Sequence, residues 1–212
     1  MILKAYTVGS LAVRAYLIGC PDTGEAMIID PAGSEKMLAE EIDKAGLTLS
    51  YIVNTHGHPD HTCGNRKMKD LTGAPVLMHE LDDRIFREPA AVQIFRSWGF
   101  EPAPPADRHV GAGDMIKIGN LEFDVIHTPG HSPGSVCIYG MGYIVTGDTL
   151  FVGAVGRTDL PEGSYDILMQ SLKEYIVPLP DSTIVLPGHD YGASPQSTIG
   201  HEKKYNPYLN NL

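Results

Sequence analysis

The sequence predicts an α+β fold in which two β-sheets lie face to face and helices cover their outer sides. Three observations predict this arrangement. Short apolar runs separated by glycine or proline recur along the chain, as is typical of strands. Each half also contains a segment with helical spacing of its apolar residues, 34–46 in the first and 164–176 in the second. In each half a further short apolar run then leads directly to a histidine, His56 or His189, so polar residues should gather where strands end.

Length and composition favour a single globular domain spanning residues 1–212. The chain is 42% hydrophobic and 20% charged, which excludes disordered and fibrous classes. A net charge of −10 argues against sequence-independent nucleic-acid binding and against a basic membrane-surface helix. The sequence shows neither an apolar run long enough for a membrane span nor the pattern of a signal peptide. We therefore expect no nucleic-acid or membrane partner. The three cysteines form no C-x-x-C pair, which favours neither a disulfide framework nor a cysteine zinc site, so we expect a protein of the reducing cytoplasm.

The first half should contain four short strands, which are rich in apolar residues: 2–8, 14–18, 26–29 and 49–53. The first helix should begin after Ser34, the expected N-cap, and end at Gly46. Further helical segments are expected at 65–71 and 79–86 and, with weaker periodicity, at 93–98. The proline-rich residues 101–106 should form a loop.

The second half should begin with four further strands: 115–118, 121–126, 136–139 and 143–145. Its helix should begin after Ser164 as the N-cap. We expect one stripe of that helix to be buried: Tyr165, Leu168, Leu172, Tyr175 and Ile176. Another apolar strand, 183–186, then leads to His189. The two halves show no sequence repeat that proves duplication, but their similar order of elements predicts two packed sheets.

Three of the nine histidines lie within the segment 56–61, which reads HGHPDH. Pro59 favours an extended backbone at His58, so the side chains of His56 and His58 should project on the same side. Gly57 would let the chain bend close to an ion. This local geometry predicts a metal site, although a solvated surface cluster of histidines is the alternative.

Asp60 and His61 follow the turn in the same segment and should point in a different direction. They cannot easily join the ion held by the first pair of histidines, which indicates a second metal position. Imidazole and carboxylate ligands without thiolate suit zinc, iron or manganese, and they disfavour a cysteine-rich structural site.

Four segments in this order resemble the motifs of the metallo-β-lactamase superfamily: 55–61 (THGHPDH), 128–135 (TPGHSPGS), 147–151 (GDTLF) and 187–191 (PGHDY). Within that superfamily, 156–159 (GRTD) and 198–202 (TIGHE) resemble the glyoxalase II-like hydrolases, or hydroxyacylglutathione hydrolases. The resemblance covers essentially the whole chain. It implies a four-layer αββα sandwich, in agreement with the elements predicted above.

The resemblance also implies two divalent metal ions, with zinc as the leading choice and iron or manganese as the others. Each ion would have three ligands of its own and would share a bridging carboxylate: His56, His58 and His131 for one, Asp60, His61 and His189 for the other, with Asp148 as the bridge. A hydroxide bridging the metals would then attack a thiolester carbonyl. Asp60 would be catalytic as well, by orienting that hydroxide.

For the substrate, the resemblance implies a small thiolester such as S-lactoylglutathione or a related acyl-thiol, contacted by Arg157 and Tyr191. Arg157 could instead form a salt bridge with Asp159. Glutathione-preferring glyoxalase II enzymes carry an additional C-terminal helical region with basic contacts, and this sequence ends at Leu212, about where that region would begin. The sequence therefore supports the hydrolytic centre better than it supports a glutathione site.

The main alternative is a persulfide dioxygenase, because the same motifs also resemble those of that family. It would use one iron, held by His56, His131 and Asp148, with open positions for oxygen and substrate. The short length and the ending 198–207 favour the hydrolase. Other superfamily members fit less well: a flavin-linked diiron oxygen reductase would want Glu at His58, a tRNA-processing nuclease would conflict with the charge of −10, and a common zinc β-lactamase would usually have Cys at Asp148. The oligomeric state is not predicted.

The remaining histidines are expected at surface or structural positions: His79, His109, His127 and His201. Cys20 and Cys137 should be small core residues. Cys63, just past the histidine cluster, should lie outside the direct contacts of the site, with an oxidation-sensitive thiol as the alternative.

Overall fold

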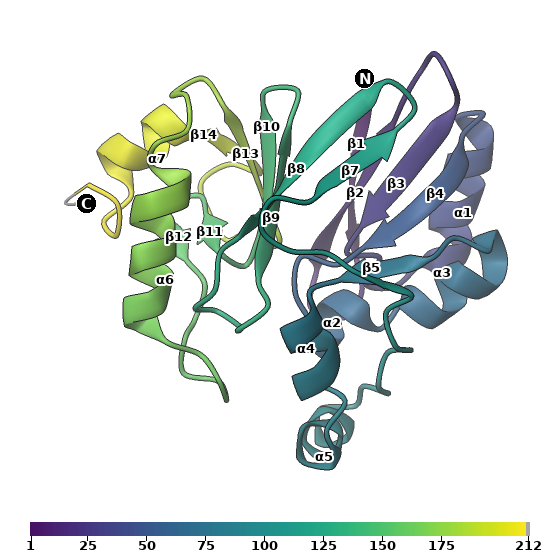
Figure 1. Ribbon diagram of the computed structural model, residues 1–212, viewed down its shortest axis with the longest axis horizontal. Helices are drawn as coiled ribbons and strands as arrows, with labels where there is room; N and C mark the ends of the chain where they lie inside the picture. The colour runs from purple at the N-terminus through teal and green to yellow at the C-terminus, as the bar shows by residue number, and fades with distance from the viewer. Residues whose placement is uncertain (211–212) are drawn as a thin grey trace.

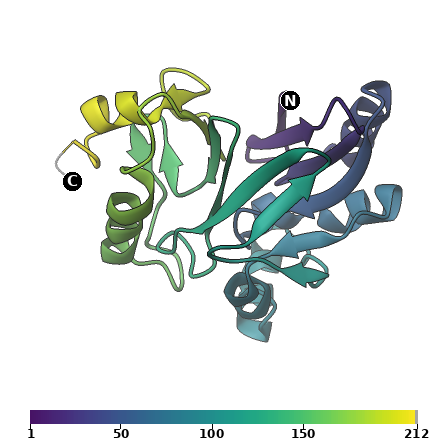
Figure 2. The ribbon, with the colours of Figure 1, turned by 45° about the horizontal axis from the view of Figure 1, so that its top comes forward.

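A computed structural model describes residues 1–210, which form two six-stranded sheets packed face to face with helices on their outer sides (Figure 1). The first sheet has the strand order β1-β2-β3-β4-β5-β6, and the second has the order β14-β13-β10-β9-β8-β7. Seen from a second direction, the helices still lie outside the two sheets (Figure 2). The predicted αββα sandwich is confirmed.

The first sheet begins as an antiparallel meander and continues as parallel strands joined by helices. Its strands are β1 (Ile2–Val8), β2 (Val13–Gly19), β3 (Glu25–Ile29), β4 (Thr48–Val53), β5 (Val76–Met78) and β6 (Arg108–His109). Strands β1 to β3 pair antiparallel, and β3 to β6 pair parallel. The helices of this half are α1 (Glu35–Lys44), α2 (Pro59–Thr62), α3 (Asn65–Thr72), α4 (Glu80–Ile85) and α5 (Pro89–Ser97).

The second sheet is mostly antiparallel. Its strands are β7 (Met115–Ile118), β8 (Leu121–His127), β9 (Val136–Gly140), β10 (Tyr143–Gly147), β13 (Ile184–Pro187) and β14 (Ser197–Thr198). A small hairpin, β11 (Leu150–Phe151) with β12 (Ala154–Val155), lies outside it. Helix α6 (Tyr165–Ser171), its π-helical continuation (Leu172–Ile176) and α7 (Ile199–Tyr205) cover the outer face.

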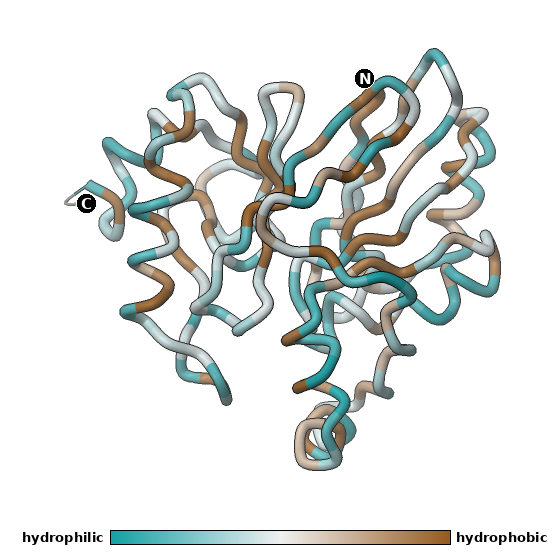
Figure 3. Tube along the Cα trace, in the orientation of Figure 1, coloured by the Kyte–Doolittle hydropathy of each residue, from teal (hydrophilic) through white to brown (hydrophobic). Residues whose placement is uncertain are grey.

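Three apolar layers hold these elements together. Between the sheets, alternate residues of the first sheet such as Tyr16 and Ile18 pack against Phe123 and Val125 of the second. The other face of the first sheet packs against α1 and α3, and the outer face of the second sheet packs against α6 and α7. The brown apolar segments in Figure 3 accordingly follow the strands of both sheets, as burial of apolar surface requires.

The predicted helix starts differ in their chemistry. Ser34 occupies the N-cap position of α1, as predicted, but its backbone is left-handed and its side chain makes no capping hydrogen bond. Gly46, past the end of α1, has the positive φ of 67° that a helix stop favours. At the second helix, the Ser164 side chain accepts a hydrogen bond from the Ile167 amide, which confirms that cap.

The buried stripe of the second helix is narrower than predicted. Leu168, Leu172 and Ile176 are fully buried, whereas Tyr165 and Tyr175 are 50% and 46% exposed. The two tyrosines have the helical spacing of the stripe, but the hydroxyl group at the end of each ring favours contact with water. Helix α5 begins at Pro89, earlier than the expected 93, because proline is well suited to the first turn of a helix.

The strands that the sequence did not predict are short: β5, β6, β11, β12 and β14. Two or three residues carry too little periodicity to indicate a strand. None of the helices formed by residues 1–210 has the length and apolar character needed to cross a membrane.

Candidate metal centre

The residues predicted to bind metal come together at one edge of the molecule. His56 follows β4 of the first sheet, whereas His131, Asp148 and His189 follow β8, β10 and β13 of the second. Strands β10 and β13 are parallel, and β8 runs the same way because both β8 and β10 pair antiparallel with β9. The carboxyl ends of these three strands therefore meet at the same edge of the second sheet, facing the end of β4.

The first group consists of His56, His58 and His131, all buried. His131 Nε2 lies 2.9 Å from His58 Nδ1 and 3.2 Å from His56 Nε2. His58 has φ −62° and ψ 146°, the extended backbone expected before Pro59. The structure therefore brings together the three histidines that were predicted for the first ion.

The second group consists of Asp60, His61 and His189. His61 Nε2 lies 3.2 Å from His189 Nε2, and Asp60 Oδ2 lies 3.7 and 3.6 Å from these two nitrogens. Asp60 and His61 belong to the short helix α2, and their side chains meet His189. The His61 ring also lies against that of His56, with centroids 4.2 Å apart, so the two groups adjoin.

Asp148 lies between the two groups. One carboxylate oxygen, Oδ1, is 3.4 Å from His61 Nε2, and the other, Oδ2, is 3.7 Å from both His131 Nε2 and His189 Nε2. The Asp148 side chain is only 12% exposed. Its position is the one that a carboxylate bridging two ions would occupy.

These side chains fit metal ions better than they fit one another. Asp148 Oδ1 is buried and has no hydrogen-bond partner among the described residues. Nitrogens bound to one tetrahedral ion at about 2.1 Å are held roughly 3.4 Å apart, close to the spacings of 2.9–3.2 Å within the groups. One imidazole proton cannot satisfy three nitrogens at such distances. The donor set of imidazoles and carboxylates therefore suits two divalent cations of the zinc, iron or manganese type.

Asp30, a buried aspartate at the end of β3 that the sequence did not reveal, supports both groups. It accepts hydrogen bonds from the Thr55 amide at 2.8 Å, from the Thr55 hydroxyl at 2.6 Å and from His61 Nδ1 at 3.0 Å. The Thr55 hydroxyl also lies 3.1 Å from His56 Nδ1. Asp30 thus orients His61 directly and His56 through Thr55, so that Nε2 of each histidine faces the site.

Asp82 is the second buried aspartate that the sequence did not reveal. Its carboxylate accepts hydrogen bonds from the amides of Gly57 and Gly134 at 2.7 and 2.6 Å and from the Ser132 hydroxyl at 2.6 Å. It therefore joins the loop that carries His58 to the loop that carries His131. Burial raises its pKa, and these hydrogen bonds oppose the rise.

Gly57 has a packing role that the sequence did not predict. A Cβ atom at this position would overlap the Phe86 ring and lie 3.0 Å from Cβ of Asp82. The glycine is therefore needed because helix α4 packs directly against the histidine loop. The expected role of Gly57, to let the chain bend close to an ion, stays a prediction.

The two groups differ in their protonation. Burial and the neighbouring imidazoles, chiefly His61 for His56 and His131 for His58, lower the pKa of His56 and of His58 well below its ordinary value. Burial also lowers the pKa of His61, but the nearby carboxylates of Asp148, Asp60 and Asp30 outweigh it and raise the pKa to about 10.

The same charges act on Asp60. Burial raises its pKa, but the adjacent His61 and His189 outweigh this effect and bring the pKa well below its ordinary value. Asp60 is therefore ionised at neutral pH, as a metal ligand or a group that orients water must be.

The candidate substrate residues lie in a cavity of about 500 Å³ above the metal-binding side chains, which Asp60, His58, His131, Asp148 and His189 help to line. Tyr191 lines this cavity, and its ring stacks on that of His189 with centroids 4.9 Å apart.

Arg157 lines the same cavity but forms a two-pronged salt bridge with Asp159, at 2.7 and 2.8 Å. The alternative reading of Arg157 as an ion-paired residue is thus confirmed. Both side chains of the pair are largely exposed, so the pair can still meet a ligand.

The remaining histidines have structural or surface positions, as expected. His79 caps α4 and stacks on His127 with ring centroids 4.2 Å apart, and His109 Nε2 lies 2.9 Å from Asp83 Oδ2. His201 is exposed and lies against Tyr205.

The cysteines are all free thiols. Cys20 and Cys137 are fully buried, as expected for core residues. Cys63 is half-buried and donates to the Asp60 carbonyl at 3.6 Å. Burial and the nearby Asp60 and Glu35 raise its pKa to about 11, which disfavours the reactive thiolate.

Comparison with known proteins bears on the same residues. The family model described as the metallo-β-lactamase superfamily matches residues 8–189, which include all of the metal-binding candidates. A protein from Aquifex aeolicus is 36% identical over all of this chain and 99% of its own length. Hydroxyacylglutathione hydrolase GloC from Haemophilus influenzae is 34% identical over 89% of each chain.

Solved structures show the same architecture. The BLEG-1 B3 metallo-β-lactamase superposes with a TM-score of 0.89 at 36% identity and covers 98% of this chain and 99% of its own. ETHE1 from Myxococcus xanthus has a TM-score of 0.84 at 30% identity, covering 99% and 85%. TTHA1623, solved in a di-iron-bound form, has a TM-score of 0.84 at 34% identity, covering 97% and 100%.

Proposed function

The chain belongs to the metallo-β-lactamase superfamily, and from this premise we propose that it is a binuclear metal-dependent hydrolase that cleaves a small thiolester such as S-lactoylglutathione. The observation that carries the proposal is the position of Asp148, 3.4–3.7 Å from histidines of two complete three-residue groups. A shared carboxylate between two sets of ligands is the arrangement that two adjacent ions need. Zinc is our first choice of metal, and the di-iron form of TTHA1623 keeps iron as an alternative.

Two divalent ions at these positions would lower the pKa of a water molecule between them and polarise the carbonyl group of a bound ester. The residues of the chain supply the rest. Asp60 is ionised, 17% exposed and directed toward the cavity, so it can accept a hydrogen bond from water and orient it. A departing thiolate needs little help from a general acid, and none is required beside the site.

The thiolester is supported by the relatives and by the cavity. The Haemophilus relative is named a hydroxyacylglutathione hydrolase. Arg157 and Tyr191 line the cavity beside the metal-binding residues, where a cation and a hydroxyl can meet a polar, anionic thiol. We propose these two residues as contacts of the thiol portion of a small-molecule substrate, and we propose the cytoplasm as the location, since the three cysteines are free thiols.

A persulfide dioxygenase is the second candidate. His56, His131 and Asp148 form two imidazoles and one carboxylate in contact, with His131 Nε2 3.2 Å from His56 Nε2 and 3.7 Å from Asp148 Oδ2. Such a triad suits a single iron with open positions. The second group of Asp60, His61 and His189 is equally complete, however, and this favours the two-metal hydrolase.

The test combines metal analysis of the purified protein with three activity assays. We expect two ions per chain and hydrolysis of S-lactoylglutathione without oxygen uptake. One iron per chain, no thiolester hydrolysis and oxygen consumption on glutathione persulfide would establish the dioxygenase instead. Hydrolysis of a chromogenic β-lactam, assayed because of the similarity to BLEG-1, with no thiolester activity would overturn the substrate class but keep the hydrolase.

A further inference from the structure

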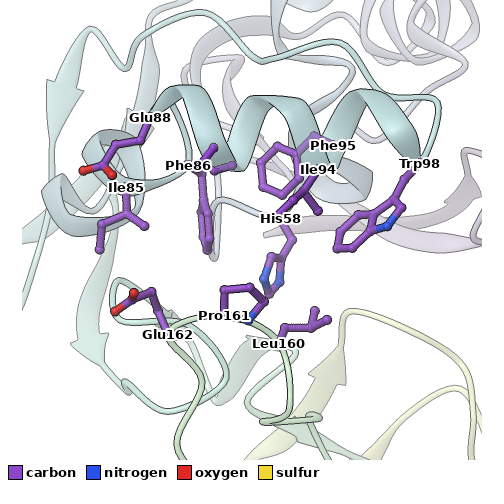
Figure 4. Close-up of a pocket in the computed structure, with 12 residues that line it drawn as sticks. His58, Ile85, Phe86, Glu88, Ile94, Phe95, Trp98, Leu160, Pro161 and Glu162 are labelled. Atoms are coloured by element: carbon purple, nitrogen blue, oxygen red, sulfur yellow. The ribbon is translucent and has the colours of Figure 1, made fainter.

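A second, apolar cavity of about 140 Å³ adjoins the metal centre (Figure 4). It lies between helix α5 and the loop 160–162, and its walls are formed mainly by apolar side chains: Ile85, Phe86, Ala91, Ile94, Phe95 and Pro161. These residues belong neither to the metal-binding groups nor to the candidate thiol contacts. The proposed hydrolysis of S-lactoylglutathione, whose acyl group is small and carries a hydroxyl, gives this apolar cavity no role.

The apolar cavity shares walls with the larger cavity at the metal centre. His58, Trp98 and Leu160 line both the apolar cavity and the larger cavity that contains Asp60 and Asp148. Within the wall of the apolar cavity, the His58 ring lies against Phe86, with ring centroids 5.0 Å apart. The apolar cavity therefore adjoins, along His58, Trp98 and Leu160, the space where a carbonyl group beside the metal-binding residues would lie.

The charged residues of the apolar cavity are both acidic. Glu88 and Glu162 lie at the end away from Trp98, and none of the residues 1–210 that line the cavity is a lysine or arginine (Figure 4). A substrate group that ended in a carboxylate would lose its hydration there and face two negative charges. The polar side of the metal centre, with Arg157 and Tyr191, belongs only to the larger cavity.

We propose that the apolar cavity binds the acyl group of the substrate and selects an uncharged, apolar acyl group of about six carbons, either a straight chain or a phenyl ring. This inference rests on the proposed thiolester hydrolysis and names its substrate class. A cavity of about 150 Å³ lined by aliphatic and aromatic side chains holds a benzene-sized ligand, which sets the size. The polar thiol portion then lies on the side of Arg157 and Tyr191, because burying its polar groups against Phe86 and Ile94 would leave them without partners.

The expected selectivity follows from burial of apolar surface. Each methylene that enters the cavity should raise kcat/KM about fourfold. A hexanoyl ester should therefore exceed the acetyl ester of the same thiol by on the order of a hundredfold. An adipoyl ester, with the same number of carbons and a terminal carboxylate, should fall at least about tenfold below hexanoyl.

Trp98 offers a direct measure of occupancy, because it is the only tryptophan of the chain and lines both cavities. The first experiment titrates the metal-loaded protein with the thioether S-hexyl-N-acetylcysteamine, which cannot be hydrolysed. We expect a saturable change in tryptophan fluorescence and a much weaker one with the S-methyl compound. This readout does not depend on catalysis.

The second experiment compares two substitutions on α5. Ala91 lines the apolar cavity, so Ala91→Phe should fill it, whereas Gln93 is exposed on the same helix and lines neither cavity. Ala91→Phe should abolish the hexanoyl-over-acetyl preference for N-acetylcysteamine esters and retain acetyl hydrolysis. Gln93→Phe, the matched control, should keep the preference.

The outcomes separate this inference from the proposed function. Hydrolysis of all esters without dependence on chain length, together with unchanged fluorescence, would overturn the acyl site and leave the hydrolase intact. Absence of thiolester hydrolysis, with saturable thioether binding that Ala91→Phe removes and Gln93→Phe keeps, would overturn the thiolester and establish the apolar site. If neither hydrolysis nor binding is detected, both proposals are wrong.

Discussion

The two metal-binding groups differ in charge although they lie side by side. The first consists of three buried imidazoles, and burial together with neighbouring imidazoles keeps the pKa of His56 and His58 low. The second contains the carboxylate of Asp60, and its His61 has a pKa raised to about 10 by Asp148, Asp60 and Asp30 in spite of burial. The first group is therefore ready to accept a cation at neutral pH. The second holds a proton that a cation must displace.

This difference shows what each group contributes. In the proposed two-metal centre, neutral imidazoles would add no charge to the first ion, which would meet only the shared carboxylate of Asp148 and so keep more of its attraction for a carbonyl oxygen. The additional carboxylate of Asp60 would hold the second ion strongly once the proton has left. Asp148 and Asp30 connect the two groups, one as the shared carboxylate between them and the other through His61 and Thr55. The following changes test how independent the two groups are.

The largest effect is expected for Asp148→Ala. Both ions would lose their common anion, and two cations would remain close together without it. Metal content should fall from two ions to less than one, and hydrolysis should become undetectable. Metal analysis after dialysis, paired with the thiolester assay, provides the measurement. Near-normal metal content in this variant, with loss of both ions in His189→Ala, would show that Asp148 is not the bridge.

A smaller effect is expected for Asp30→Asn. The amide keeps one acceptor oxygen but presents an NH2 donor in place of the other, so it can no longer accept from the Thr55 amide and from His61 at the same time. Affinity for the second ion should fall about 10- to 100-fold, and affinity for the first should fall less, because Thr55 still contacts His56. Competition with a coloured chelator measures both affinities.

Asp82→Asn is the matched control for this prediction, because Asp82 supports only the loops of His58 and His131. Asp82→Asn should lower the affinity for the first ion more than the affinity for the second. The same order of losses in both variants would show that the two aspartates do not support separate groups.

The pH dependence of metal binding should differ between the groups. Since His61 has a pKa of about 10 in the metal-free protein, binding at the second group releases a proton, and affinity should rise up to about tenfold per pH unit between pH 6 and 9. Affinity at the first group should change little over this range, because its His56 and His58 are already neutral. Calorimetry in buffers of different ionisation enthalpy measures the protons released. Equal proton release by the two ions would contradict this assignment.

The same shift acts on the stability of the metal-free fold. A folded pKa of about 10, raised from 6.5, stabilises the protein fully below pH 6.5, and this contribution is lost as the pH rises through about 10. The free energy of unfolding of the chelator-treated protein, measured with denaturant, should therefore contain a contribution from His61 that falls between these pH values. The substitution His61→Gln should remove this contribution.

The smallest effect is expected at the thiol contacts. Arg157→Ala should raise KM for S-lactoylglutathione severalfold, whereas Tyr191→Phe should raise it less, because only a hydroxyl group is removed. Arg157 is largely exposed and already paired with Asp159, which limits its contribution. Steady-state kinetics with Asp159→Asn as a control distinguishes the two roles of Arg157: if Asp159→Asn raises KM as much as Arg157→Ala does, the pair matters for loop structure and not for the thiol.

The metal-binding side chains could be predicted because their sequence neighbours constrain them. The proline after His58 sets its backbone, and Asp60 and His61 follow in the short helix α2. The longer strands and helices carried enough periodicity to be recognised. Asp30 and Asp82 could not be predicted. Each is a lone aspartate, and its role depends on a hydrogen bond to a loop residue 25 positions away, which only the fold brings into contact. Likewise, Gly57 is explained by helix α4, which only the folded chain brings against it.

The apolar cavity was also beyond the reach of the sequence. Its walls come from α4, α5 and the loop 160–162, which lies more than sixty positions after the two helices, and only part of α5 was predicted. Apolar residues on a helix indicate burial but do not show whether a protein side chain or a ligand covers them. Only the meeting of α5 with the loop 160–162 distinguishes the two.

Each ion would also join distant parts of the chain. His58 and His131, in the first group, are 73 residues apart, and His61 and His189, in the second, are 128 residues apart. A pair of ions at these positions would act as a reversible cross-link between the two halves of the sandwich, comparable in effect to staples that close long loops. The free energy of metal binding is then partly a free energy of folding. Without metal, the chain must close a loop of 128 residues through the apolar contacts between the sheets and the hydrogen bonds that cross between the halves, such as those from Ser132 and Gly134 to Asp82.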